Sequence, residues 1–91
     1  MEKRIGINGF GRIGRAIFRI ARSERDVRIC CINDVNENLA NHAYLLKYDS
    51  IYGKFPGNVE LRKDSRSLEV DLESVPFYSL EDIRDVPWSS H

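Results

Sequence analysis

The chain has 91 residues, 42% of them hydrophobic and 31% charged, and its 14 basic residues are balanced by 14 acidic ones. This length allows at most one small domain, with a thin margin of stability. Because the net charge is zero, no overall field draws the protein to nucleic acid or to a membrane, and we expect neither as a partner. The first apolar run is too short for a signal peptide or a membrane span. We therefore expect a cytoplasmic protein.

The two cysteines, Cys30 and Cys31, are adjacent within a predicted strand. Neighbouring strand side chains point to opposite faces, so a disulfide between them has poor geometry. A mid-strand cysteine also lacks the base and the electropositive surroundings of a nucleophile, so we interpret both as reduced core residues. The histidines, His42 and His91, are predicted to lie at the surface. We predict no catalytic residue and no metal site.

The first third of the chain predicts alternating strands and helices. A strand is expected at about 4–8, with Ile5 and Ile7 on one face, and an almost continuously apolar strand at 27–32. A helix between them, at about 11–23, carries two stripes at helical spacing. The expected inward stripe is Ile13, Ala16, Ile17, Ile20 and Ala21. The expected solvated stripe is Arg12, Arg15, Arg19 and Arg22.

The rest of the chain predicts one more helix and then short strands. The helix is expected over about 37–47, capped by Asn36, with Leu39, Ala43 and Leu46 facing inward. Alternation of apolar and polar residues at 59–61 and 68–72 predicts a hairpin that turns within 62–67. A third short strand is expected at 75–78, and one helical turn at 80–85.

Three glycines follow the first strand at the spacing G-x-G-x-x-G. Gly9 is expected to permit a tight turn in which a Cβ would clash, Gly11 to let the backbone approach a pyrophosphate, and Gly14 to pack the helix closely on the strand. The free amides of the first helical turn would then face the phosphates, with Arg12 as an added cationic contact. The alternative is that the glycines only make a strand-to-helix turn.

Asp34 ends the second apolar run about 20 residues after Gly14, the distance typical of the acid that binds a dinucleotide ribose. A carboxylate there favours a free 2′-hydroxyl and repels a 2′-phosphate, so NAD is preferred over NADP. The alternative is a helix cap or turn acid, which would leave this preference unsupported. Together these features predict an α/β fold: a partial Rossmann-type, doubly wound parallel sheet that comprises the first βαβαβ half plus a short β-hairpin.

Residues 4–15, RIGINGFGRIGR, resemble the amino-terminal signature of phosphorylating glyceraldehyde-3-phosphate dehydrogenases, as does IND at 32–34. The run YLLKYDS at 44–50, with Gly53 and Phe55, is similar to the exit of that family's second helix. Pro87 and Trp88 resemble the residues before its next core strand. The resemblance spans nearly the whole chain. Erythrose-4-phosphate dehydrogenase shares most of these features and is the nearest rival.

The resemblance implies an NAD site in which Arg12 and Ile13 contact the pyrophosphate through their backbone, while Asp34 accepts hydrogen bonds from the adenosine ribose. The full set of cofactor-binding residues that it implies is Asn8, Gly9, Phe10, Gly11, Arg12, Ile13, Gly14, Asn33 and Asp34. Two positions depart from the family. Tyr52 stands where a histidine is usual, and Glu81 where a basic residue near the adenine is usual.

Members of this family catalyse with a cysteine in a Ser-Cys-Thr-Thr-Asn segment and a distant histidine, and the chain has neither. We therefore expect a fragment, with residues 1–91 as a single partial dinucleotide-binding domain. It would comprise a βαβα core at about 1–50 and a hairpin with extra strands at about 51–88. The rest of the dehydrogenase subunit would be its partner, in a family that forms tetramers.

The isolated chain is predicted to be inactive as an aldehyde-phosphate dehydrogenase. Two other hypotheses stay open. One is a free-standing, non-catalytic module that binds a nucleotide or a partner. The other is a degenerate reading frame without activity.

Overall fold

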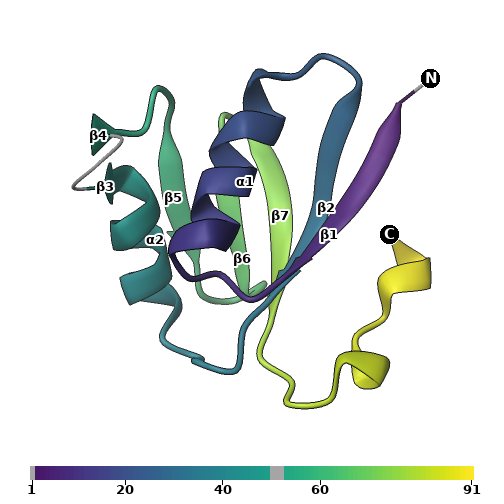
Figure 1. Ribbon diagram of the computed structural model, residues 1–91. Helices are drawn as coiled ribbons and strands as arrows, with labels where there is room; N and C mark the ends of the chain where they lie inside the picture. Colours follow the sequence, from purple (N-terminus) through teal and green to yellow (C-terminus); the bar gives the residue numbers. More distant parts are fainter. Residues whose placement is uncertain (1, 50–52) are drawn as a thin grey trace.

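The computed structural model describes residues 2–49 and 53–91, which form one five-stranded sheet, a small two-stranded sheet and two α-helices (Figure 1). The strands of the main sheet are β1 (Lys3–Asn8), β2 (Val27–Asn33), β5 (Val59–Arg62), β6 (Ser67–Val70) and β7 (Glu73–Tyr78). The helices are α1 (Arg12–Ser23) and α2 (Leu39–Lys47). The remaining elements are β3 (Tyr48–Asp49), which pairs with β4 (Gly53–Lys54), and the 3-10 turns η1 (Ile83–Asp85) and η2 (Trp88–Ser90).

The main sheet has the strand order β1-β2-β7-β6-β5. β1, β2 and β7 are parallel, whereas β6 and β5 are antiparallel to their neighbours. The sequence β1-α1-β2-α2-β7 is thus a βαβαβ unit, and the hairpin of β5 and β6 interrupts its second crossover. The partial Rossmann-type fold is confirmed. The strand expected at 75–78 is the third parallel strand of this unit, not an appendage beside it.

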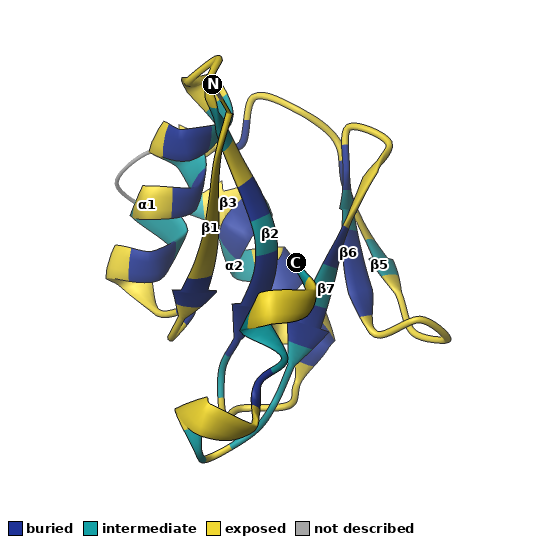
Figure 2. Cartoon of the chain, turned by 90° about the vertical axis from the view of Figure 1, so that its right-hand side faces the viewer, coloured by how far each residue is buried: buried dark blue, intermediate teal, exposed yellow. Residues whose placement is uncertain are grey.

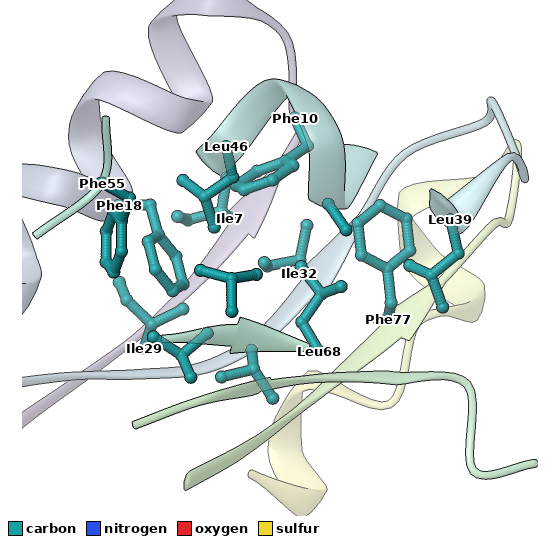
Figure 3. Close-up of a cluster of buried hydrophobic side chains, with 14 of the residues drawn as sticks. Ile7, Phe10, Phe18, Ile29, Ile32, Leu39, Leu46, Phe55, Leu68 and Phe77 are labelled. Carbon is teal, nitrogen blue, oxygen red and sulfur yellow. The ribbon is translucent and has the colours of Figure 1, made fainter. Parts of the chain in front are cut away.

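The hydrophobic core fills the space between the sheet and the two helices (Figure 3). Three aromatic rings organise it: Phe10 meets Phe18 and Phe77 edge to face, with ring centroids 5.9 and 6.0 Å apart. Edge-to-face pairs of this kind add about 0.5–1.5 kcal/mol beyond the apolar area they bury. The predicted inward residues of α2, Leu39, Ala43 and Leu46, are confirmed as part of this core.

The predicted inward face of α1 is wrong for its isoleucines, whereas Ala21 is buried as expected. The buried residues of α1 are Gly14, Phe18 and Ala21, while Ile13, Ile17 and Ile20 are 76%, 45% and 62% exposed. Figure 2 shows this exposed side of the helix next to β1, which is largely exposed and forms one edge of the sheet. The contact at Gly14 fixes the rotation of the helix, and the residues four and seven positions further along then face the sheet. We call Ile13, Ile17 and Ile20 the isoleucine ridge.

The expected solvated stripe of arginines is also largely wrong. Arg12 is exposed, but Arg15, Arg19 and Arg22 are half-buried and bonded. Arg15 donates to the carbonyl oxygen of Phe10 at 3.1 Å. Arg19 donates to the carbonyl oxygens of Leu46 and Gly53 at 2.7 and 2.8 Å. Arginine is well suited to this position because its flexible stem packs on apolar surface while its fork satisfies carbonyls at element ends.

Arg22 lies 3.4 Å from Asp71 and 3.3 Å from Glu73, both near the start of β7. The second strand of the hairpin is shorter than predicted, because Asp71 and Leu72 adopt positive φ angles of 49° and 72° and turn the chain into β7.

The predicted cap of the second helix is wrong as well. Asn38, not Asn36, accepts the capping hydrogen bond, from the amide of Asn41 at 3.1 Å.

The opposite face of the sheet is covered in part by the last residues of the chain. The ring of Trp88 lies against Gly6 so closely that a Cβ at Gly6 would overlap it. His91, expected at the surface, is half-buried and its Nε2 lies 2.7 Å from the hydroxyl of Tyr78. In the two ranges that the structure describes, no helix is long and apolar enough to cross a membrane.

The orientation of α1 predicts unequal costs for two adjacent substitutions. Phe18→Leu shrinks a fully buried side chain and is expected to lower the free energy of unfolding by about 1–2 kcal/mol. Ile17→Ser alters the exposed ridge and is expected to change it by less than about 0.5 kcal/mol. Urea unfolding of both variants measures this difference. Equal losses would show that the ridge belongs to the core.

Candidate functional site

The candidate site is the turn between β1 and α1, at the carboxyl end of the parallel strands. Gly9 has φ +97°, a conformation that side chains other than glycine rarely adopt. A Cβ at Gly9 would meet no atom within 4 Å, so the expected clash is wrong and backbone conformation is the reason for glycine. A Cβ at Gly14 would overlap the carbonyl oxygen of Gly9, so the expected close packing is confirmed.

Gly11 leaves open space where a phosphate group would approach. A Cβ there would meet nothing within 4 Å, and Gly11 is the N-cap of α1 with no side-chain capping bond. The first amides of a helix have no partner within the helix, and the dipole makes this end positive. No acidic residue lies in the first turn to oppose an anion. Arg12 is exposed at the first position of the helix.

A groove of about 590 Å³ runs along this end of α1 and the open edge strand. Six of the predicted cofactor residues line it: Asn8, Gly9, Gly11, Arg12, Ile13 and Gly14. The side chains of the other three lie elsewhere. Phe10 is fully buried in the core and Asn33 is 2% exposed, so neither ring nor amide lines a groove. Asp34 lies beside the turn, with its side chain 18% exposed.

The carboxylate of Asp34 is bonded directly to the glycine turn. Its Oδ2 accepts a hydrogen bond from the backbone amide of Phe10 at 2.6 Å, and its Oδ1 accepts one from the amide of Asn36 at 2.9 Å. Hydrogen bonds from amides to an ionised carboxylate are short and strong. A carboxylate has about four acceptor positions, so two are left for another donor. The structure thus brings the glycine turn and the predicted ribose acid together.

Asn33 has a different position from the one predicted: it joins three strand ends. Its side-chain nitrogen donates to Asn8 Oδ1 at 2.9 Å and to the carbonyl oxygen of Leu80 at 3.0 Å. Its Oδ1 accepts from the amide of Leu80 at 3.0 Å. The carbonyl oxygen of Asn33 also accepts from the amide of Gly9 at 2.6 Å. These bonds satisfy the buried amide and hold the ends of β1 and β2 and the segment after β7 in register.

His42, predicted at the surface, is buried beside the site. It is 4% exposed, its ring packs on that of Phe77 with centroids 4.8 Å apart, and Nε2 lies 2.7 Å from the carbonyl oxygen of Asn36. Its position in the sequence carried the signal: it lies three residues after Leu39 and four before Leu46, on the same helix face.

Cys31 shows none of the features of an activated nucleophile. Cys31 is 1% exposed, and burial raises the pKa of its thiol, with a further contribution from Cys30. Cys30 was predicted in the core, but it is only half-buried and lines a surface pocket with Arg28 and His91. Both cysteines are free thiols. Because the thiolate is the reactive form, a raised pKa makes Cys31 a poor nucleophile. Within the part of the chain that the structure describes, no group of acidic, histidine or cysteine side chains could hold a metal ion.

Two residues, Glu81 and Tyr52, depart from the family pattern. Glu81 is exposed, in the segment that follows Leu80 and its bonds to Asn33. Tyr52 lies outside the described residues.

The glycine turn predicts a contrast between two substitutions. Gly14→Ala places a methyl group on the carbonyl oxygen of Gly9, and we expect it to lower the free energy of unfolding by about 1–3 kcal/mol. Gly11→Ala meets open space at a φ of −80°, and its expected cost is below about 1 kcal/mol. Urea unfolding compares the two. A Gly14→Ala variant as stable as Gly11→Ala would contradict the close contact.

Comparison with known proteins agrees with this geometry. The family model "Glyceraldehyde 3-phosphate dehydrogenase, NAD binding domain" matches residues 3–91. A glyceraldehyde-3-phosphate dehydrogenase of Ajellomyces capsulatus is 41% identical over all of this chain, which covers 26% of that protein. One from Monascus purpureus is 44% identical over 94% of this chain and 25% of its own length. A chloroplastic one from Arabidopsis thaliana is 42% identical over 97% of this chain and 21% of its own length. The chain therefore spans about a quarter of the length of these relatives, and it belongs to the NAD-binding domain family of glyceraldehyde-3-phosphate dehydrogenase.

Proposed function

We propose that this chain forms the adenosine and pyrophosphate side of the NAD site of a phosphorylating glyceraldehyde-3-phosphate dehydrogenase. The single observation that carries the proposal is the hydrogen bond between the Phe10 amide and the Asp34 carboxylate. It brings the ribose acid next to a glycine turn whose helix end is uncapped and open. The pyrophosphate site and the ribose site of one dinucleotide need this proximity.

The pyrophosphate is proposed to lie over Gly11, against the backbone amides of Arg12 and Ile13. Open space at Gly11 supports this placement, because a pyrophosphate needs room close to the backbone. The positive end of the helix dipole attracts the charge of the phosphates, and the exposed side chain of Arg12 adds to it. Gly9 and Gly14 shape the turn, and together with Asn8 they line the groove.

The ribose is proposed to bind Asp34 through the two acceptor positions that the backbone amides leave. The carboxylate is partly exposed, so a hydroxyl can reach it. A 2′-phosphate would bring negative charge against the carboxylate, and the site should therefore take NAD rather than NADP. Phe10 and Asn33 would support this arrangement from the core, with the amide of Phe10 and the side chain of Asn33 already bonded there.

Titration of the chain with NAD, AMP and NADP, followed by NMR, tests this site. We expect amide shifts confined to residues 9–14 and 34, with NAD and AMP binding more tightly than NADP. Asp34→Asn removes the charge and is expected to weaken NAD binding by about tenfold, since a hydrogen bond to a charged group contributes about 1.5–3 kcal/mol. Amide shifts that leave out residues 9–14 and 34, or an Asp34→Asn variant that binds NAD as the original does, would refute the proposed site.

We further propose that residues 1–91 are one partial dinucleotide-binding domain whose partner is the rest of a dehydrogenase subunit. Support comes from the isoleucine ridge and the unpaired outer edge of β1, which lie side by side (Figure 2). Exposed apolar patches mark interaction surfaces, and an unpaired strand edge is ready to accept another strand. A cytoplasmic location and a homotetramer are proposed on the family relationship, and the free thiols are compatible with a reducing compartment.

In the complete enzyme, a cysteine thiolate would add to the aldehyde to form a thiohemiacetal. Hydride would pass from this adduct to NAD, and phosphate would release the acyl group from the sulfur. The Ser-Cys-Thr-Thr-Asn segment that carries this cysteine in the family has no counterpart in residues 1–91, and burial raises the pKa of the Cys31 thiol.

The purified chain is therefore expected to show no NAD reduction with glyceraldehyde-3-phosphate and phosphate. Absorbance of NADH measures this directly, with a complete dehydrogenase as the positive control. Turnover that persists after repeated purification would overturn the assignment of a purely cofactor-binding role.

A further inference from the structure

His42 touches both residues whose backbone amides hold the Asp34 carboxylate. Its ring packs edge to face on Phe10, with centroids 6.0 Å apart, and the Phe10 amide donates to Oδ2 of Asp34. Its Nε2 lies 2.7 Å from the carbonyl oxygen of Asn36, whose amide donates to Oδ1 of Asp34. One imidazole from α2 thus supports the carboxylate from two directions.

The hydrogen-bond pattern settles which ring nitrogen carries the proton. A carbonyl oxygen only accepts, so Nε2 of His42 donates to Asn36. Nδ1 is buried and has no hydrogen-bond partner among the described residues. The Nε2 to Asp34 Oδ1 distance is 3.9 Å, too long for a hydrogen bond, so the effect of His42 on the carboxylate passes through Asn36 and Phe10.

The imidazole is held rigidly enough to act in this way. Its side chain is 5% exposed, and its ring also packs on Phe77 at 4.8 Å. The carboxylate that it supports lies in the loop between β2 and α2, where Asp34, Asn36 and Asn38 form successive side-chain turns. Such loops move more than the core that they leave. A buried contact from α2 restricts this movement.

We propose that His42 is a positioning residue for Asp34, and that it sharpens selection for a ribose with a free 2′-hydroxyl. The inference rests on the proposed function, since it takes Asp34 as the ribose ligand. A hydrogen bond to a hydroxyl weakens steeply when its acceptor moves out of line. Loss of the Asn36 contact lets the carboxylate move and so reduces the contribution of the 2′-hydroxyl.

The test compares the affinities of ADP and 2′-deoxy-ADP for the 91-residue chain by NMR titration. The dissociation constant of 2′-deoxy-ADP divided by that of ADP measures how much the 2′-hydroxyl contributes to binding. A change in the folded fraction scales both constants equally and cancels in the ratio, so a merely structural role for His42 would not move it. His42→Leu is expected to reduce the ratio by about threefold or more, as a charge-assisted hydrogen bond is weakened. His42→Gln, which keeps an N–H donor, is expected to retain more of it.

Asp34→Asn separates failure of the inference from failure of the proposed function. If Asp34→Asn leaves the ratio unchanged, Asp34 does not bind the ribose and the proposed function fails. If Asp34→Asn reduces the ratio but His42→Leu does not, the positioning role of His42 is refuted. If His42 acts through Asp34, His42→Leu has no further effect on the ratio in the Asp34→Asn background. An additional loss in the double variant also refutes the inference.

A measurement on the unsubstituted chain applies even where His42→Leu does not fold. The imidazole nitrogen resonances of His42 are expected to shift when ADP binds and to shift much less with 2′-deoxy-ADP at the same saturation. Equal shifts with both ligands would show that the imidazole does not sense the 2′-hydroxyl, and would overturn the proposal.

Discussion

The short hydrogen bond from the Phe10 amide to the Asp34 carboxylate is the constraint on which the site depends. It joins the turn before α1 to the end of β2, two segments that meet only in the folded chain. The ring of Phe10 is fully buried between Phe18 and Phe77, so its amide cannot move without disturbing the core. The position of the carboxylate is therefore set by the packing of aromatic rings beneath it. Rigid support of this kind is what keeps a binding group in its productive geometry.

A second constraint acts on the strands themselves. The side-chain amide of Asn33 forms hydrogen bonds with Asn8 and Leu80. Its backbone carbonyl oxygen accepts a hydrogen bond from the amide of Gly9. The amide of Asp34 in turn donates to the carbonyl oxygen of Tyr78 at 3.0 Å. The ends of β1, β2 and β7 are thus fixed to one another before the ribose acid begins. A buried amide with every group bonded specifies a single arrangement, because any slip would leave a polar group unsatisfied in the core.

Local signals in the sequence predicted the glycine turn and the hairpin, and Asp34 lies bonded to that turn. The glycine spacing depends on backbone conformation and close contact at Gly14, which are local properties. The alternation in β5 and β6 likewise reflects a local pairing, and their register follows it. The third parallel strand was part of the predicted βαβαβ half, but the pairing of β7 with β2 after a long insertion is a non-local property that no local pattern specifies.

Burial on α1 was predicted on the wrong side for a physical reason. A prediction from hydrophobic periodicity assumes that the most apolar stripe faces the core. The stripe of isoleucines is more hydrophobic than the stripe of Gly14, Phe18 and Ala21. The orientation is set instead at Gly14, where the helix lies so close to the carbonyl oxygen of Gly9 that a Cβ would overlap it. His42 was misjudged for a related reason: one polar residue within an apolar stripe gives no sign that a loop carbonyl will satisfy it.

The arginine side and the isoleucine side of α1 differ in how they are covered. Three arginines face neighbouring loops and strands, where they donate to carbonyls or pair with carboxylates, and the isoleucine ridge faces outward beside the outer edge of β1. For a domain that stood alone, the lower-energy arrangement would be the reverse, with apolar groups covered and guanidinium groups in water. The contact at Gly14 imposes the observed orientation, and the ridge stays uncovered as a consequence. The glycine that shapes the turn before α1 therefore also leaves an apolar surface exposed, of the kind that marks interaction sites.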